Sequence, residues 1–131
     1  MGSEHFWVVY NRAPVLPGHS MVIPKAHYKS FLDLGPALRT EMTELSIAAV
    51  ERLQKVFGAE GFNWTIQDGQ PAGQTVMHLH LHLIPRHRGD LPDPGDWYPR
   101  LQAHNSNIDS QARPRLSTAE LKAIARRLRK A

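Results

Sequence analysis

The sequence of 131 residues contains no cysteine and no long apolar segment. Without cysteine, the chain can form no disulfide, no Cys-based zinc finger, no iron–sulfur cluster and no thiol nucleophile. No run reaches the roughly 18 apolar residues that a membrane-spanning helix requires, and the first residues do not follow the pattern of a secretory signal peptide. We therefore expect a cytoplasmic protein that does not cross a membrane.

The length and composition correspond to a single domain. With 41% hydrophobic residues, a chain of this size can bury a core without help from metals or disulfides. We expect one domain over residues 1–131, with a core at residues 6–90, a loop excursion at residues 91–115 and a basic C-terminal helix at residues 116–131. The sequence contains no internal repeat.

The net charge of +4 is unevenly distributed along the chain. Residues 112–131 carry seven basic side chains and one acidic one, a net charge of +6, whereas residues 1–111 carry a net charge of −2. Runs of charge on terminal helices are usually solvated faces. We therefore expect no nucleic-acid partner, and we expect the function to reside in the weakly acidic body of the protein.

The hydrophobic pattern predicts an α+β protein with an antiparallel sheet. Segments rich in β-branched and aromatic residues indicate strands, and apolar residues in steps of three and four indicate helices. Strands are expected at residues 6–10, 20–23, 62–67 and 76–84, and helices at residues 36–57 and from about Ser117 onward. Pro36 suits the first turn of its helix, and Gly58 suits the residue that ends it.

Histidine is concentrated in one short segment. From Val76 to Ile84 the residues alternate, so an extended strand would place three histidines on one face and the leucines between them on the other. The histidines are His78, His80 and His82. Alternate residues of a strand lie about 6.6 Å apart, so the three imidazoles would form a row, while the leucines would pack toward the 36–57 helix.

A row of imidazoles suits phosphoryl or nucleotidyl transfer. Neighbouring rings can orient one another, so that one presents a nucleophilic nitrogen while another donates to phosphate oxygens. A purely structural role is disfavoured, because three partly buried imidazoles without partners would cost about 1–3 kcal/mol each. A metal centre using two of these histidines with His19 or Asp68 stays open, although the outer two rings lie about 13 Å apart on an ideal strand.

The segment from His78 to Ile84 resembles the signature of the histidine triad (HIT) superfamily of nucleotide hydrolases and transferases. Residues 10–19, 67–76 and 85–90 resemble the fragile histidine triad (Fhit) branch, which hydrolyses diadenosine polyphosphates. The resemblance covers about residues 6–104. It implies a HIT-like fold with about five strands, one long central helix and a C-terminal helix.

The resemblance also implies roles for the histidines. His80 would attack the α-phosphorus of a dinucleoside polyphosphate, diadenosine triphosphate or tetraphosphate, and form a nucleotidyl-histidine intermediate. Water would then release a nucleoside monophosphate. His82 would hydrogen-bond the phosphate and assist the leaving group, while His78 and His19 would orient the row.

Four further residues would bind substrate according to the resemblance. Phosphate oxygens would be held by Gln67, Gln74 and Thr75, and the ribose hydroxyls by Asn11. Without the family argument, Asn11 also fits a turn and Gln67 a structural strand end. The aromatic pair at residues 97–98 fits either packing or a flap over the site.

The imidazole chemistry requires no cofactor and no metal, and a divalent cation would enter only with the polyphosphate substrate. The resemblance implies a homodimer.

Fhit-like proteins have an N-terminal strand or hairpin ahead of the segment that begins here at Phe6, and we expect this piece of the nucleobase wall to be missing. His82 stands where the uridylyltransferase branch has glutamine, which favours a hydrolase.

Other functions stay open beside polyphosphate hydrolysis. The same histidines could serve an adenosine phosphoramidase of the Hint type, or a dinucleoside polyphosphate phosphorylase with phosphate as the acceptor. A nucleotide-binding signalling module with slow turnover is the alternative from a different class of protein.

Overall fold

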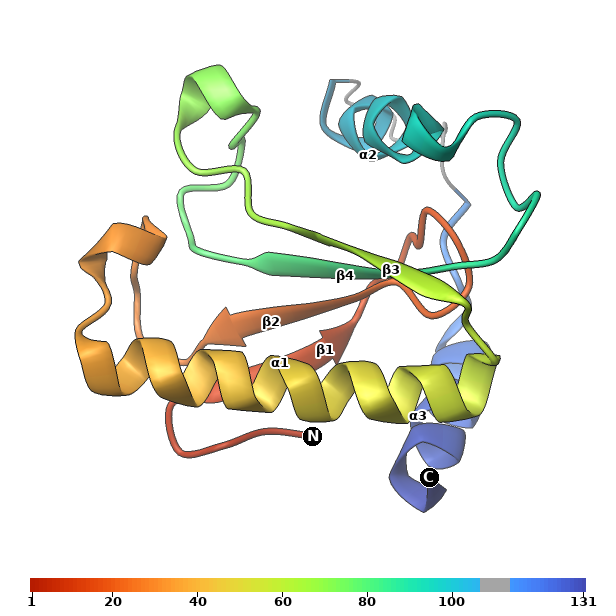
Figure 1. The fold of residues 1–131 in the computed structure, drawn as a ribbon, viewed down its shortest axis with the longest axis horizontal. Helices are drawn as coiled ribbons and strands as arrows, with labels where there is room; N and C mark the ends of the chain where they lie inside the picture. Colours follow the sequence, from red (N-terminus) through yellow and green to blue (C-terminus); the bar gives the residue numbers. More distant parts are fainter. Residues whose placement is uncertain (107–113) are drawn as a thin grey trace.

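The computed structural model describes residues 1–106 and 114–131 and has an α+β architecture (Figure 1). Within these residues, four strands form one antiparallel sheet in the order β1-β2-β4-β3. They are β1 (Phe6–Tyr10), β2 (Ser20–Pro24), β3 (Gly61–Thr65) and β4 (Leu81–Arg86). The fold class expected from the sequence is therefore confirmed.

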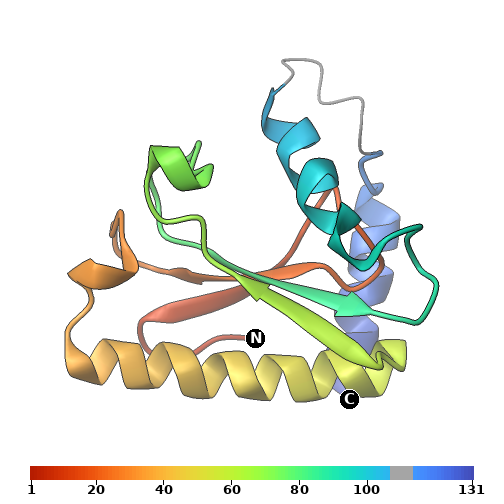
Figure 2. The same ribbon diagram turned by 45° about the horizontal axis from the view of Figure 1, so that its top comes forward.

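Three α-helices in the described part of the chain pack around the sheet. They are α1 (Pro36–Phe57), α2 (Trp97–Ser106) and α3 (Thr118–Lys130). Helix α1 runs along one face of the sheet, α2 lies on the opposite side, and α3 packs beside the C-terminal end of α1 (Figures 1 and 2). No helix within residues 1–106 and 114–131 is long and apolar enough to cross a membrane.

The bounds of α1 agree with those predicted. Pro36 occupies the first turn, where its missing N–H costs no hydrogen bond. Gly58 ends the helix in the left-handed region, with φ of 66°, and its N–H donates to the carbonyl of Gln54. The apolar face of the helix, which includes Met42 and Leu53, forms the core with Phe6, Val22, Leu79 and Leu83.

The sheet has four strands in the described part of the chain, not about five. Residues 1–3 fold back along the outer edge of β1, where Gly2 makes a single antiparallel bridge to Trp7. The N–H of Val8 donates to Met1 O, and the N–H of Ser3 donates to Phe6 O. Residues 1–3 are therefore paired with β1 through one bridge and do not form a strand.

The strand expected at residues 76–84 is shorter than predicted and shifted toward its C-terminal end. Its ladder with β2 begins at the pair Val22 and Leu81, so only His82 of the three histidines lies in β4. β2 ends at Pro24, which has no N–H to continue the ladder. The backbone before β4 instead pairs with the loop that follows β2, where Leu79 N–H donates to the carbonyl of Tyr28.

The loop expected at residues 91–115 contains helical structure. Asp93 and Asp96 form a capping box around a 3-10 turn, η3 (Pro94–Asp96), which leads directly into α2. The Pro, Gly and Asp residues that suggested a loop here start a helix, because Pro and Asp are favourable in a first turn. Residues 107–113 lie outside the described part of the chain.

The expected C-terminal helix is present as α3. Ser117 caps it by accepting the N–H of Glu120. Leu128 packs against the core, and the Arg127 guanidinium donates to Val56 O and lies over the Phe57 ring, 5.4 Å from its centroid. The helix therefore packs on the folded body, with many of its basic side chains exposed.

Candidate active site

The three histidines lie on the face of the sheet opposite α1. Leu79, which precedes His80, and Leu83, which follows His82, are buried in the core that α1 covers. Alternation therefore directs the histidines to the other side, where α2 and the short 3-10 turn η2 (Gln70–Ala72) also lie (Figure 2). This part of the expected geometry holds even though β4 begins only at Leu81.

His19 joins the row from the loop between β1 and β2. It is fully buried, and its Nε2 lies 2.9 Å from Nδ1 of His82. The backbone N–H of Val15 donates to His19 Nδ1 at 3.1 Å, so a neutral His19 carries its hydrogen on Nε2 and donates it to His82. His82 in turn carries its hydrogen on Nε2, the form that can donate to a phosphate oxygen.

His80 has the opposite tautomer. Its Nδ1 lies 2.7 Å from the carbonyl oxygen of His78, and a carbonyl can only accept. The hydrogen is therefore on Nδ1, and Nε2 holds a lone pair. The His80 and His82 rings meet edge to face, with centroids 4.9 Å apart. A nucleophilic nitrogen and a donor nitrogen are thus present on adjacent rings.

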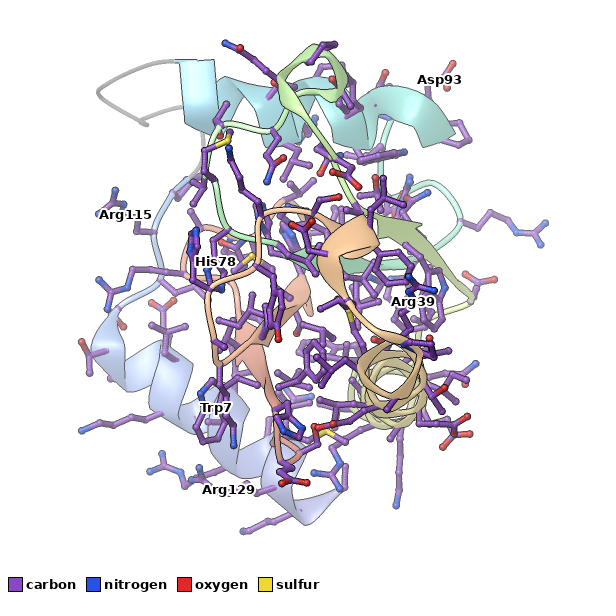
Figure 3. All side chains as sticks on the ribbon, turned by 90° about the vertical axis from the view of Figure 1, so that its left-hand side faces the viewer. Trp7, Arg39, His78, Asp93, Arg115 and Arg129 are labelled. Atoms are coloured by element: carbon purple, nitrogen blue, oxygen red, sulfur yellow. The ribbon has the colours of Figure 1, made fainter. Side chains whose placement is uncertain are left out.

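His78 anchors the start of the row. Figure 3 labels its side chain. The His78 Nε2 donates to the carbonyl oxygen of Pro24 at 3.1 Å, and its Nδ1 lies 3.4 Å from Nδ1 of His27. Sequence reasoning did not identify His27, because it lies 51 positions from His78. No periodicity within its own segment indicates the contact, which arises only when the chain after β2 returns to the row.

Asn11 forms a turn and also lies beside the histidines. Its side-chain oxygen accepts the N–H of Ala13 at 2.9 Å, which forms a turn, and its amide nitrogen lies 3.5 Å from His19 Nε2. The side chain is buried beside the His19–His82 pair. Its contact with the ribose stays a prediction.

The glutamines are buried and hold their own loops. Gln74 accepts the N–H of Gly69 at 2.8 Å and donates to the carbonyls of Lys29 and Val76. Gln67 donates to Thr65 Oγ1 at 3.1 Å. In this structure Gln74 therefore ties the loop after β3 to the segment before α1. The phosphate contacts expected of Gln67, Gln74 and the exposed Thr75 stay predictions.

Asp68, a candidate partner of the histidines in a metal centre, makes a hydrogen bond to a serine. Its carboxylate accepts the hydroxyl of Ser30 at 2.8 Å. Across residues 1–106 and 114–131, no three His, Cys, Asp or Glu side chains are arranged to hold a metal ion.

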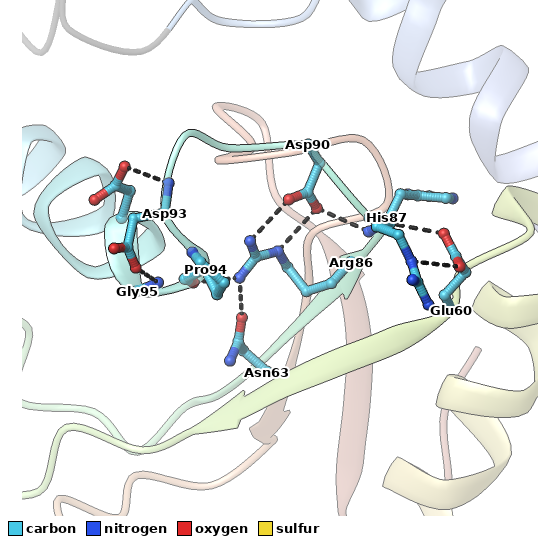
Figure 4. A network of polar contacts seen from close by, with 10 residues as sticks. Glu60, Asn63, Arg86, His87, Asp90, Asp93, Pro94 and Gly95 are labelled. Carbon is cyan, nitrogen blue, oxygen red and sulfur yellow. Dashed lines mark hydrogen bonds and ion pairs between the residues drawn. The ribbon is translucent and has the colours of Figure 1, made fainter.

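The segment after β4 is fastened to the sheet by Arg86 (Figure 4). Its guanidinium makes two hydrogen bonds to Asp90, both of 2.8 Å, and also donates to Asn63 Oδ1 and to the carbonyl of Pro94. Hydrogen bonding from Arg86 lowers the pKa of Asp90 to about 2, and hydrogen bonding to Asp90 raises the pKa of Arg86. This network holds the turn that leads into α2.

Comparison with known proteins agrees with this geometry. The family model of the HIT domain matches residues 1–89, more than half of the chain. The protein therefore belongs to the HIT family, whose fold and histidine row it shares.

Two curated relatives are enzymes of nucleotide hydrolysis. The chain is 41% identical over 103 residues to the asymmetrical bis(5'-nucleosyl)-tetraphosphatase of Schizosaccharomyces pombe, a match that covers 76% of this chain and 55% of that protein. It is 32% identical over 102 residues to the bifunctional bis(5'-adenosyl)-triphosphatase/adenylylsulfatase FHIT of Arabidopsis thaliana, covering 78% and 57%. The chain thus matches little more than half the length of either relative.

A solved structure shares the fold over almost the whole chain. A hypothetical histidine triad nucleotide-binding protein from Sulfolobus tokodaii superposes with a TM-score of 0.78. The match covers 99% of this chain and 79% of that protein, at 24% sequence identity. This likeness establishes the fold of the chain.

Proposed function

We propose that this protein is a nucleotidyl hydrolase that cleaves dinucleoside polyphosphates, diadenosine triphosphate or tetraphosphate, at the α-phosphate. The observation that carries the proposal is the tautomer pattern, a lone pair on His80 Nε2 beside a ring that donates from His82 Nε2. The names of the two curated relatives support the same substrate class.

In the first step His80 Nε2 attacks the α-phosphorus and forms a P–N bond. The bond to the bridging oxygen breaks, and the leaving phosphate departs with the electron pair while His82 Nε2–H donates a hydrogen bond to it. The His80 ring becomes positively charged. Its Nδ1–H already donates to His78 O, and this hydrogen bond strengthens when the donor is charged.

In the second step water attacks the phosphorus of the nucleotidyl-histidine. The P–N bond breaks, its electron pair returns to Nε2, the water proton is released, and the nucleoside monophosphate leaves. No metal enters either step, and a divalent cation would arrive with the polyphosphate. Asn11 would hold the ribose, while Gln67, Gln74 and Thr75 would contact phosphate oxygens.

The test of this function is to trap the covalent intermediate. Protein incubated with diadenosine tetraphosphate labelled at the α-phosphorus and quenched rapidly should retain acid-labile, base-stable label on His80. Label on another residue would refute the assignment of the nucleophile. If the intact protein neither turns over nor retains label, the hydrolase proposal fails.

The competing activities are separated by comparing substrates. A Hint-type phosphoramidase would hydrolyse adenosine phosphoramidate faster than diadenosine tetraphosphate, and a phosphorylase would yield nucleoside diphosphate when inorganic phosphate is added. Adenylyl sulfate belongs in the same comparison, because one relative is also named as an adenylylsulfatase. Tight nucleotide binding with almost no product would favour a signalling module.

We further propose that the protein acts in the cytoplasm as a homodimer. The outer edge of β3 favours self-association, because β3 is an edge strand that exposes Trp64. At the other edge of the sheet, Gly2 already makes a bridge to β1.

A further inference from the structure

Helix α2 carries a buried polar atom that no hydrogen bond satisfies. The side-chain nitrogen of Gln102 is buried and has no hydrogen-bond partner among the described residues. An amide donor buried in this way lowers stability, and almost all buried donors in native proteins are paired. Its presence therefore needs an explanation beyond packing.

The Gln102 amide lies against the loop that precedes the histidines. A Cβ atom placed on Gly73 would be 2.7 Å from Gln102 Nε2 and 3.0 Å from the Tyr98 hydroxyl. Gly73 also has φ of +93°, a conformation that favours glycine. Helix α2 can therefore approach the loop this closely only because residue 73 is glycine, which has no side chain.

Gln102 belongs to the histidine side of the molecule. Both α2 and the segment around η2 rise from the face of the sheet opposite α1 (Figure 2). The loop continues from Gly73 through Gln74, whose amide is engaged in three hydrogen bonds within the protein. Next to this loop, the nitrogen of Gln102 is a donor that the fold leaves unused in the described part of the chain.

We infer that Gln102 is a specificity-determining residue that donates a hydrogen bond to the leaving part of the substrate, at phosphate oxygens beyond the α-phosphate. The inference rests on the proposed function. In the proposed mechanism, a substrate with its α-phosphate at His80 would place its further phosphates on the side of the sheet where α2 and the Gly73 loop lie. A neutral amide donor suits an anionic oxygen, because a hydrogen bond to a charged acceptor is stronger than one between neutral groups.

The test compares two substrates that share the nucleotide but differ in the leaving group. Diadenosine tetraphosphate has a phosphate chain beyond the α-phosphate, and adenosine phosphoramidate has none. For Gln102→Leu we expect kcat/KM to fall by about tenfold or more with the polyphosphate, mainly through KM. With the phosphoramidate the change should be less than about twofold.

Two further variants sharpen the comparison. Gln102→Glu should lose more activity with the polyphosphate than Gln102→Leu, because it places a carboxylate against phosphate oxygens. Gln54→Leu is the matched control, since Gln54 is exposed on α1 and should behave like the unmodified protein. The melting temperature of Gln102→Leu should equal or exceed that of the unmodified protein, because an unsatisfied donor has been removed.

The outcomes decide between a substrate contact and a structural role. Equal losses with both substrates, or a lowered melting temperature without substrate dependence, would overturn the inference. If the unmodified protein hydrolyses neither substrate, the proposed function fails, and binding of ATP relative to AMP then tests Gln102 separately. A preference for ATP that Gln102→Leu removes supports the contact, and an unchanged preference overturns it.

Discussion

The chemistry of the site depends on which nitrogen of each imidazole carries the hydrogen. Two backbone groups decide this, since the N–H of Val15 donates to His19 and the carbonyl of His78 accepts from His80. The nitrogen that donates and the nitrogen with the lone pair, the proposed nucleophile, are thus set by neighbours that cannot change their own protonation. This arrangement needs no separate base to activate His80, because a neutral imidazole already presents a lone pair.

At the residue scale, His80→Ala should abolish turnover and leave binding intact. In the proposed mechanism the imidazole supplies the attacking atom, so we expect kcat to fall by about a thousandfold or more. Nucleotide affinity, measured by calorimetry, should change by less than about threefold. His5→Ala, which alters an exposed histidine hydrogen-bonded to Glu41, is the control. Retained turnover in His80→Ala would exclude His80 as the nucleophile.

A second prediction concerns His19, whose Nε2–H donates a hydrogen bond to Nδ1 of His82. His19→Leu leaves the buried N–H of Val15 without its acceptor and removes the donor to His82 Nδ1. We expect the free energy of unfolding to fall by about 1–3 kcal/mol and kcat to fall by about a hundredfold. Urea unfolding and steady-state kinetics measure the two effects. A stability loss with unchanged kcat would show that His19 only fills space.

At the scale of elements, the site is assembled from segments that meet above the sheet. β4 carries His82, the loop between β1 and β2 carries His19, and α2 packs against the loop that contains Gly73. The contacts that position α2 include one at Gly73 and one through the Arg86–Asp90 network at its start. Both contacts can be tested by single substitutions.

Gly73→Ala should displace α2 from the loop. The new Cβ would meet Gln102 and Tyr98, and the left-handed backbone at φ of +93° disfavours alanine. We expect a loss of about 1–2 kcal/mol in the free energy of unfolding and a raised KM for diadenosine tetraphosphate. Gly89→Ala, also at positive φ but with no atom within 4 Å of the new Cβ, controls for backbone strain alone. Equal KM values for the two variants would contradict this prediction.

The Arg86–Asp90 pair predicts a pH dependence of stability. The pKa of Asp90 is lowered from its ordinary value of 3.8 to about 2, so its contribution is complete above pH 4 and disappears as the pH falls through 2. Asp90→Asn should therefore be less stable than the unmodified protein by about 2 kcal/mol at pH 7. The difference in free energy of unfolding should shrink between pH 4 and pH 2. A difference that stays constant over this range would refute the assignment.

At the scale of the whole molecule, the two sheet edges differ in how they are covered. β1 carries Trp7, which is 49% exposed but bridged by Gly2 and contacted by Lys25, whereas β3 exposes 47% of Trp64. If the β3 edge forms the dimer interface, Trp64→Lys should yield a monomer in light scattering while Trp7→Lys remains a dimer. A dimer that persists in Trp64→Lys would place the interface elsewhere.

Parts of the fold could be predicted because their signals are local. Pro36 and Gly58 bound α1, and the alternation of leucine and histidine separates the core face from the site face. The start of β4 could not be predicted, since it depends on Pro24 ending the partner strand. The helix at residues 97–106 was missed because its capping residues have the composition of a loop.

The sequence by itself determined the fold class and the histidine row, because periodicity and residue type are properties of neighbouring positions, and the resemblance of its motifs to the HIT superfamily implied the family. Only the tertiary structure decided which histidine nitrogen holds a lone pair, where His27 lies, and which atom of α2 lies against the loop at Gly73. These features depend on hydrogen bonds and contacts between segments distant in the chain, such as His19 with His82 and His78 with Pro24. Such pairings exist only after the sheet and helices have packed.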